Sequence, residues 1–350
     1  MHATTVGVDL AKTRFEVVVS DAQCRIQRRE RLTRGRFTQF FANHPPSLIV
    51  MEACGSAHYW ARALQAQGHE VRLLPAQYVR AYVRRNKTDA ADAAALIEAA
   101  RCADIRPVPV KSVDQQLLQQ LHRLREQCKN TRTARINLLR GCLREFGINI
   151  PVGIERGIQA VREALEIADN GLPDVLRPFV QEVLQEISTL KQRVDHLERT
   201  LADLTREDPI VRELLRVPGV GLLIATALRA AVGDIQRFPT GRHLACWLGL
   251  TAREHSSGEK RRLGSISKQG DVYLRTLLVH GARSALLATK RAAQAGRPLD
   301  RLRTWALQTE QRCGCNKATV ALANKLARII WATWRYQRPF NGNWQAQLRH

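Results

Sequence analysis

Residues 4–20 of the chain read TTVGVDLAKTRFEVVVS. Two apolar runs rich in β-branched residues, 4–8 and 15–20, flank the turn-like segment DLAKTR, and this pattern predicts two β-strands joined by a short connection. Asp9 follows the first run directly, so we expect a strand to carry this carboxylate at its end. The stretch therefore predicts a sheet with an acidic side chain at its edge.

Further strands and a helix follow in alternation. SLIVMEA at 47–53 is a short apolar run that contains Glu52 at its end, and HEVRLLP at 69–75 is another such run. The segment between them, HYWARALQAQG, has a helical pattern that Gly68 closes. Strands that alternate with helices predict an α/β domain over residues 1–110.

A third acidic feature lies in KTDAADAAAL at 87–96. Asp89 and Asp92 are three residues apart, so in a helix their side chains share one face. The alanines around them are small enough to let this helix lie close to the strands. Both carboxylates could then reach the ion that Asp9 and Glu52 approach from the sheet.

These four acids form a candidate metal site. Ligands of open α/β sheets gather at strand ends, and several carboxylates stay ionised together only beside cations, because mutual repulsion raises their pKa values. Oxygen ligands in this number suit Mg²⁺ or Mn²⁺, and two ions can clamp the reacting oxygens of a phosphodiester. Each acid alone also has an ordinary explanation as a turn residue or a first-turn helix charge. Their joint occurrence in one small domain favours the metal site.

Residues 111–205 are predicted to be helical. From Leu117 a 4,3 spacing continues to position 142, with polar interruptions, and a cleaner heptad seam comprises Val183, Ile187, Leu190, Val194, Leu197, Leu201 and Leu204. Such seams predict a coiled coil or a long helical hairpin. The first helix is basic, with seven Lys/Arg against two Glu in 115–145. Its basic face is either a solvated surface or a contact surface for nucleic acid, in which case the partner helix would form the dimer. The candidate nucleic-acid contacts are Arg123, Arg125, Lys129 and Arg132.

The charge of the chain is strongly positive and uneven. It has 55 Lys+Arg against 32 Asp+Glu, a net charge of +23, and residues 206–350 alone hold 25 basic and 9 acidic residues. This excess predicts a polyanionic partner, namely nucleic acid. No apolar run is long enough for a membrane span, the N-terminus lacks a signal-peptide pattern, and eight scattered cysteines fit a reducing cytoplasm. We therefore expect a cytoplasmic protein without a membrane partner.

The region 206–350 is predicted to be mostly helical. LLRVPGVGLLIATALRAAVG at 214–233 reads as a helix-hairpin-helix element whose Gly219 and Gly221 flank the turn. Such a hairpin can point backbone N–H groups at a phosphate. The alternative is a plain turn between helices, in which glycine only supplies conformational freedom.

The segment TAREHSSGEKRR at 251–262 reads as an exposed loop with two adjacent serines. A serine in such a place is usually an ordinary loop residue, and a catalytic role requires activation of its weakly nucleophilic hydroxyl. Basic residues surround the pair and either contact phosphates or form a solvated loop. They are Arg253, Lys260, Arg261, Arg262 and Lys268.

The motifs VGVDLAK, VMEACG and KTDAADAAAL resemble the D-E-D-D motifs of the RuvC-like transposases of bacterial insertion sequences, a family that includes the Piv/MooV DNA invertases. The stretch from VPGVG to ISKQGD resembles the second domain of that family. The resemblance implies a ribonuclease-H-like fold in which Asp9, Glu52, Asp89 and Asp92 bind metal. It also implies that the serine before glycine, Ser257, forms a 5′-phosphoserine intermediate, with Ser256 as the neighbour to be distinguished from it.

The resemblance further implies a structured bridge RNA that selects donor and target DNA by base pairing. We therefore expect a bacterial, nucleoid-associated transposase that acts as a dimer or tetramer. Its acids and its serine, far apart in the chain, would meet within one subunit or between two. The alternatives are a metal-dependent nuclease of the Holliday-junction type that uses water, and a non-catalytic nucleic-acid-binding protein.

Overall fold

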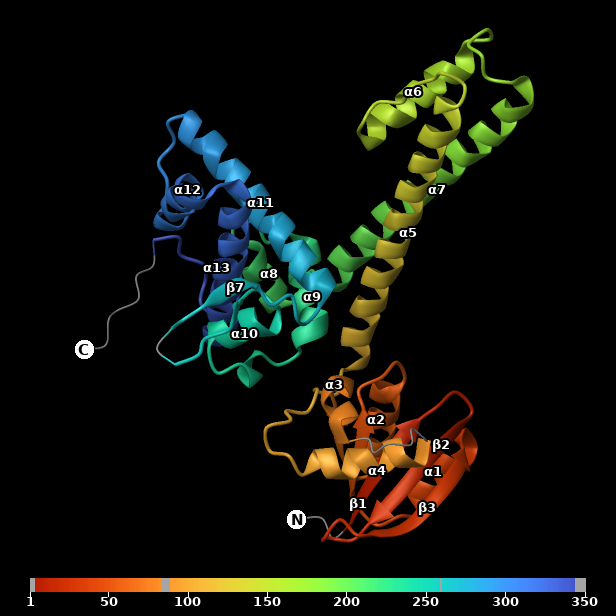
Figure 1. Cartoon of the computed structure of the whole chain (residues 1–350), viewed down its shortest axis with the longest axis vertical. Helices are drawn as coiled ribbons and strands as arrows, with labels where there is room; N and C mark the ends of the chain where they lie inside the picture. Colours follow the sequence, from red (N-terminus) through yellow and green to blue (C-terminus); the bar gives the residue numbers. More distant parts are fainter. Residues whose placement is uncertain (1–3, 83–88, 259, 344–350) are drawn as a thin grey trace. The chain divides into compact units, whose positions relative to one another are not determined.

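The computed structural model describes residues 4–82, 89–258 and 260–343, without the side chains of residues 89 and 90. The chain folds into two compact units, Met1–Val113 and Asp114–His350. The first holds a sheet and the second is mostly helical (Figure 1). This confirms the predicted mixed α/β N-terminal part followed by helices, whereas the three-part division at 110 and 205 stays a prediction.

The first unit is built on a mixed five-stranded sheet in the order β3-β2-β1-β4-β5. The first three strands of the chain pair antiparallel, and β4 and β5 extend the sheet in parallel from β1. The strands are β1 (Thr5–Leu10), β2 (Arg14–Ser20), β3 (Ile26–Thr33), β4 (Leu48–Glu52) and β5 (Glu70–Leu74).

Helices cover both faces of this sheet. On one face α1 (Arg34–Ala42) and α2 (Ala57–Ala66) bury Phe37 and Trp60, which pack edge-on against each other and against Phe15 of β2. On the other face lies α4 (Asp89–Ala100), and the short helix α3 (Ala76–Val79) follows β5. The sheet is therefore the middle of three layers, with an apolar core on each side.

Strand β3 and helix α1 were not predicted from the sequence. β3 reads IQRRERLT, and only Leu32 of its eight residues is buried. It is one of the two edge strands of the sheet, so its charged side chains face solvent and leave no alternating apolar pattern to detect. The strand is held by backbone pairing to β2 and by the ion pair of Arg31 with Glu16.

The second unit begins with a long antiparallel helical hairpin. Its helices are α5 (Val113–Arg144) and α7 (Arg177–Leu204), with α6 (Ile154–Glu166) packed at the far end (Figure 1). The pairs Arg125–Glu198 and Arg135–Glu186 cross between the two long helices in antiparallel register. The apolar seam of α7 packs on α5 of the same chain through Val183, Ile187 and Leu201, which confirms the hairpin alternative here, whereas the last residue of the predicted seam, Leu204, is exposed.

The predicted seam of α5 is wrong by one residue. Leu117, Leu124 and Leu138 are exposed, whereas Leu118 and Leu139 lie in the core. The buried face instead comprises Leu118, His122, Ile136, Leu139 and Leu143. Polar residues occupy the middle of the buried face, so its apolar pattern is interrupted. The exposed leucines form a more regular pattern in the sequence, which explains the predicted seam.

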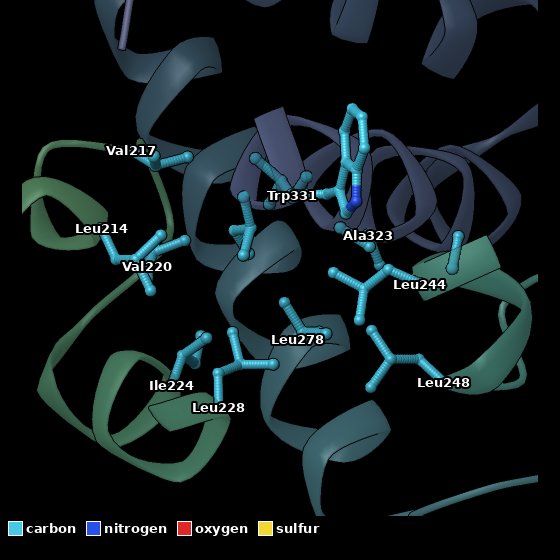
Figure 2. Packing of buried hydrophobic residues seen from close by; sticks show 14 of the residues in the cluster. Leu214, Val217, Val220, Ile224, Leu228, Leu244, Leu248, Leu278, Ala323 and Trp331 are labelled. Atoms are coloured by element: carbon cyan, nitrogen blue, oxygen red, sulfur yellow. The ribbon is translucent and has the colours of Figure 1, made fainter. Parts of the chain in front are cut away.

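The C-terminal helices form a bundle around α11 and α13. Its elements are α8 (Pro209–Leu215), α9 (Leu222–Val232), α10 (Gly241–Trp247), α11 (Val272–Gln294), α12 (Arg301–Cys313) and α13 (Cys315–Tyr336), with a small sheet of β6 (Ala252–Glu254) and β7 (Leu263–Ile266). Figure 2 shows Leu278 of α11 at the centre, between Leu228 of α9 and Leu244 and Leu248 from α10 and its C-terminal end. Short 3₁₀ turns lie at Arg80–Tyr82, Asp174–Leu176 and Ile235–Arg237. Within the described residues, no helix combines the length and apolarity that a membrane crossing requires.

A buried polar cluster joins the helical hairpin to this bundle. His122 of α5 is 4% exposed; its Nε2 lies 2.9 Å from Thr226 Oγ1 on α9, and its Nδ1 lies 3.0 Å from the Tyr273 hydroxyl on α11. Because Thr226 donates its own proton to the Leu222 carbonyl oxygen, the Nε2 atom of His122 is the donor and Nδ1 accepts from Tyr273. Burial, together with nearby Arg125, lowers the pKa of His122 to about 4. The ring is therefore neutral at physiological pH and links three helices.

Candidate active site and nucleic-acid interface

Asp9 and Glu52 lie at the same level of two neighbouring parallel strands. The β1–β4 register ends with Val8 opposite Met51, and each acid is the next residue along its strand. Neighbouring strands lie about 4.8 Å apart. The structure therefore brings together two acids that are 43 positions apart in the chain.

Both acids point toward the face of the sheet that α4 covers. A Cβ atom built on Gly7 would lie 2.2 Å from the Ala93 carbonyl oxygen, so the Gly7 position faces α4, and Asp9 two residues on shares that face. On β4, Val50 packs against Leu96 of α4, and Glu52 follows two residues later. The backbone thus places Asp9 and Glu52 on the face of the sheet against which α4 lies, as the sequence predicted.

Helix α4 begins at Asp89, and its half-buried Asp92 precedes the Ala93 that touches β1. Ala93 is completely buried, which confirms that small side chains let this helix lie against the strands. The side chain of Asp89 lies outside the described residues. The predicted role of Asp89 therefore rests on its place at the start of α4, one turn before Ala93.

One further acid lies at the same level of the sheet as Asp9 and Glu52. Glu16 of β2 is directly opposite Asp9, but it is paired with Arg31 at 3.0 Å. It was not among the sequence candidates because its neighbours in the chain carry no acidic motif. The cation beside it assigns Glu16 to the support of the edge strand.

The donor types at this edge fit a hard divalent cation, since Asp9, Glu52 and Asp92 offer only carboxylate oxygens. Among the residues that the structure describes, however, no three His, Cys, Asp or Glu side chains are gathered closely enough to hold a metal ion. Mutual repulsion between carboxylates disfavours such a group without its cation. The acids share one edge and one face, and the predicted coordination itself stays a prediction.

The serine segment, predicted as an exposed loop, is exposed and has the form of a β-hairpin. β6 and β7 pair antiparallel, and the backbone N–H groups of Ser257 and Lys260 each donate to the other residue's carbonyl oxygen, at 3.3 and 3.2 Å. Gly258 takes a φ of +56°, which favours glycine at this turn. Ser257 consequently sits at the exposed tip of the hairpin, hereafter the serine hairpin (251–267).

The two adjacent serines differ in their hydrogen bonding. The Ser256 hydroxyl donates to Glu254 Oε1 at 2.7 Å and accepts from the Arg262 backbone N–H at 3.1 Å. The Ser257 hydroxyl makes no hydrogen bond within the described residues. The bond from Ser256 and the Arg261 guanidinium lower the pKa of Glu254. Ser256 is therefore part of the hairpin's framework, whereas the exposed Ser257 hydroxyl has no partner among the described residues.

The predicted basic contacts lie along this hairpin and are all exposed. Arg253 donates to the Ser267 carbonyl oxygen at 3.0 Å, and Arg261 pairs with Glu254. Lys260 and Arg262 flank the tip, and Lys268 follows β7 with a left-handed φ of +55°. Their side chains are available to an anion, and the role as nucleic-acid contacts stays a prediction.

The glycines of the VPGVG turn are not equivalent. Gly219 has a φ of +82°, and a Cβ built on it would lie 2.5 Å from the Gly281 carbonyl oxygen of α11. Gly221 is exposed, and a Cβ built on it meets nothing within 4 Å as it caps α9. Close packing on α11 explains why residue 219 is glycine, Gly221 is the exposed one of the two, and a phosphate contact of either stays a prediction.

The four basic candidates on α5 divide in the same way. Arg123 is exposed, whereas the Arg125 side chain is only 12% exposed and its Nε lies 2.6 Å from Glu198 Oε1. Lys129 pairs with Glu126, and half-buried Arg132 lies one heptad after Arg125. Arg125 therefore belongs to the interior of the helical hairpin, and we retain Arg123 as the accessible candidate.

Two protein-family models match this chain. A transposase model of the DEDD type covers residues 6–148, and a model described as "Transposase IS116/IS110/IS902 family" covers residues 211–296. The first match contains the four acids and the second contains the serine hairpin. A "Probable family 20 transposase" of Pseudomonas aeruginosa is 43% identical over 95% of this chain and 97% of its own length. The chain belongs to the IS116/IS110/IS902 transposase family.

Other relatives of this transposase agree. The "Transposase for insertion sequence element IS1111A" of Coxiella burnetii is 36% identical over 96% of the chain and 90% of its own length. The "Pilin gene-inverting protein" of Moraxella bovis is 25% identical over 97% of the chain and 98% of its own length. The chain is thus a transposase of insertion sequences, an enzyme that cuts and rejoins DNA, and the N-terminal sheet fits a DEDD-type nuclease-like fold.

Proposed function

We propose that this transposase exchanges DNA strands through a covalent intermediate on Ser257, supported by the acids Asp9, Glu52, Asp89 and Asp92 on a ribonuclease-H-like first unit. The single observation that carries the serine assignment is the contrast at the hairpin tip. Ser256 is held by Glu254 and the Arg262 N–H, and Ser257 is exposed with its hydroxyl unbonded within the described residues.

The proposed step is a transesterification. The Ser257 oxygen attacks the phosphorus of a DNA phosphodiester and loses its proton, the bond from phosphorus to the 3′ oxygen breaks, and the leaving strand takes up a proton as a 3′-hydroxyl. The 5′ end stays linked to Ser257. A 3′-hydroxyl of another strand then attacks the phosphoserine, which restores both the DNA linkage and the serine. One phosphate ester replaces another in each step, so no ATP is needed.

The four acids would hold Mg²⁺ or Mn²⁺ when DNA is bound. Such an ion would supply charge neutralisation and polarisation of the phosphate. The residues of the chain contribute position: β1 and β4 set Asp9 and Glu52 side by side, and the Gly7–Ala93 contact holds α4 and Asp92 against them. The DEDD type of the matched family supports the dependence on a divalent metal.

Partners beyond DNA follow from the same proposal. A structured bridge RNA would select donor and target, and accessible cations such as Arg123 and those of the serine hairpin would contact the nucleic acid. A dimer or tetramer is supported by the exposed leucines Leu117, Leu124 and Leu138, which follow heptad spacing on the outside of α5.

A covalent-adduct assay tests the proposal. Wild-type chain, Ser257→Ala and Ser256→Ala are incubated with element-end DNA and Mg²⁺, with and without RNA transcribed from the element, and then denatured. We expect a denaturant-resistant protein–DNA adduct with wild type and Ser256→Ala and none with Ser257→Ala. Cleaved DNA without an adduct would replace the proposal with hydrolysis by water. DNA binding without cleavage, unaffected by a chelator, would indicate a binding protein.

A further inference from the structure

A large cleft lies in the C-terminal bundle, formed by residues other than those at the tip of the serine hairpin. It has a volume of about 1680 Å³ between the start of α10, one side of α12 and α13, and residues 338–343. A smaller hollow of about 480 Å³ shares Trp305, Lys325 and Arg328 with it and is also lined by Ala252 and Ile266. Those two residues are the first of β6 and the last of β7, so the smaller hollow borders the base of the serine hairpin.

The lining of this cleft is cationic, and none of the described residues that line either part is acidic. Its basic residues are Arg242, Lys317, Lys325, Arg301, Arg328 and Arg338. In the described part of the chain none of them forms an ion pair with a carboxylate. Like charges facing one cleft repel each other, so the arrangement costs free energy that an anionic ligand would recover.

The centre of the cleft is built rather than loose. Lys325 Nζ sits 3.9 Å from the centre of the Trp305 ring, and both residues line the two parts of the cleft. Gly241 of α10 packs closely on the backbone of Arg328, because a Cβ atom built on Gly241 would lie 3.0 Å from the Arg328 Cα. Lys325 and Arg328 therefore stand at set positions on α13.

The electrostatics of Lys325 agree with this geometry. Burial lowers the pKa of its ammonium group, and the neighbouring Arg328 and Arg301 lower it further. A bound anion would reverse the effect of the two arginines, because it would offset their charge. The cleft thus has the properties of an anion site that lacks its counter-charge.

We propose that this cleft binds the phosphodiester backbone of a nucleic-acid strand and guides it between the serine hairpin and the C-terminal end of α13. The inference rests on the proposed function only where it names the serine hairpin as one end of the path. Recognition here is by charge, because Lys325 already covers one face of Trp305 and the other lining cations are placed to contact phosphates rather than base edges.

The test uses the full chain carrying Ser257→Ala, so that binding is measured without strand transfer. Affinity for duplex DNA, single-stranded DNA and single-stranded RNA of one sequence is followed across salt concentrations. Lys325→Gln/Arg328→Gln is compared with Arg291→Gln/Arg312→Gln, which removes two exposed arginines outside the cleft. Both variants lose the same net charge.

Each lost phosphate contact lowers the slope of log affinity against log salt by about 0.9 for duplex DNA and about 0.7 for a single strand. Loss of two contacts should therefore lower the salt slope of the cleft variant by about 1.8 for duplex DNA or by about 1.4 for a single strand. We also expect its affinity to fall at least tenfold. The slope and affinity of the control variant should change clearly less. The nucleic acid that shows the loss identifies the occupant. Equal effects of the two variants on every nucleic acid would overturn the proposal.

Two controls guard against misfolding. Lys325→Arg/Arg328→Lys keeps the charges and should restore the salt slope. In the wild-type chain, bound nucleic acid should protect Lys325 from acylation and leave Lys290, which pairs with Glu310, unchanged. Unprotected Lys325 under saturating nucleic acid would also overturn the proposal, whatever the result of the adduct assay.

Discussion

Gly7 of β1 and Ala93 of α4 meet backbone to backbone, so closely that a Cβ atom at Gly7 would lie 2.2 Å from the Ala93 carbonyl oxygen. Asp9 is two residues further along the strand, and Asp92 precedes Ala93 in the helix. The contact therefore sets how near the helix acids come to the strand acids. A side chain at position 7 would increase this distance.

Gly7→Ala should displace α4 and separate Asp92 from Asp9. Overpacking of this kind costs about 1–3 kcal/mol, and we expect it to abolish strand exchange while the chain remains folded. Gly35→Ala is the matched control: it lies in α1 with nothing within 4 Å of the added carbon. It should leave activity unchanged and stabilise by at most about 1 kcal/mol. Denaturant unfolding and strand exchange measured on both variants check this, and an active Gly7→Ala chain would contradict it.

Glu254 should position the serine hairpin. Its carboxylate accepts from the Ser256 hydroxyl and pairs with Arg261. Glu254→Ala removes both contacts, so the rate of adduct formation at Ser257 should fall several-fold, whereas DNA affinity should hold or rise because a negative charge is lost. Glu254→Gln keeps an acceptor for Ser256 and should recover most of the rate. Equal rates in the three chains would show that the hairpin holds its shape without this residue.

His122 should make the second unit acid-sensitive. Its pKa is about 4 in the fold against 6.5 for the free side chain, so the unfolded chain binds the extra proton between these values. The contribution of neutral His122 to the free energy of unfolding is fully present above about pH 6.5. It decreases as the pH falls toward 4, by up to about 3 kcal/mol. His122→Gln retains polar contacts without titrating. Calorimetry across this pH range should show a flatter dependence in the variant, and identical curves would count against the buried neutral histidine.

If each active site combines the acids of one subunit with the serine of another, two inactive variants should complement each other. Asp9→Ala and Ser257→Ala chains are each expected to be inactive. After mixing under conditions that allow subunit exchange, some oligomers would combine the intact acids of the Ser257→Ala chain with the intact serine of the Asp9→Ala chain. Strand exchange should then partly return. A mixture that stays inactive after proven exchange would place the complete site in one chain.

Several features were predictable from the residues themselves. The apolar runs of β1, β4 and β5 and the heptads of α7 carry their burial pattern in the local sequence, because one periodicity decides which side chains leave water. Charge composition likewise predicted a nucleic-acid partner, since the sixteen excess positive charges of residues 206–350 are a property of the sequence whatever the fold. The alanines around Asp92 predicted close packing for a steric reason that holds in any helix.

Other features depended on tertiary contacts. β3 is a strand because β2 pairs with its backbone, which its charged sequence does not reveal. The buried face of α5 includes His122 and Arg125 because Thr226, Tyr273 and Glu198 supply their partners from other helices.

The sequence by itself thus determined the strands β1, β2, β4 and β5 of the first sheet, most of the seam of α7, the family motifs and the sign of the partner's charge. These follow from short-range periodicity and composition. Only the tertiary structure decided that Asp9 and Glu52 stand side by side, that Ser257 rather than Ser256 has a hydroxyl without a hydrogen bond among the described residues, and that cations from α10, α12 and α13 line one cleft. Such relations join residues far apart in the chain, and register, hydrogen bonding and packing fix them only when the chain is folded.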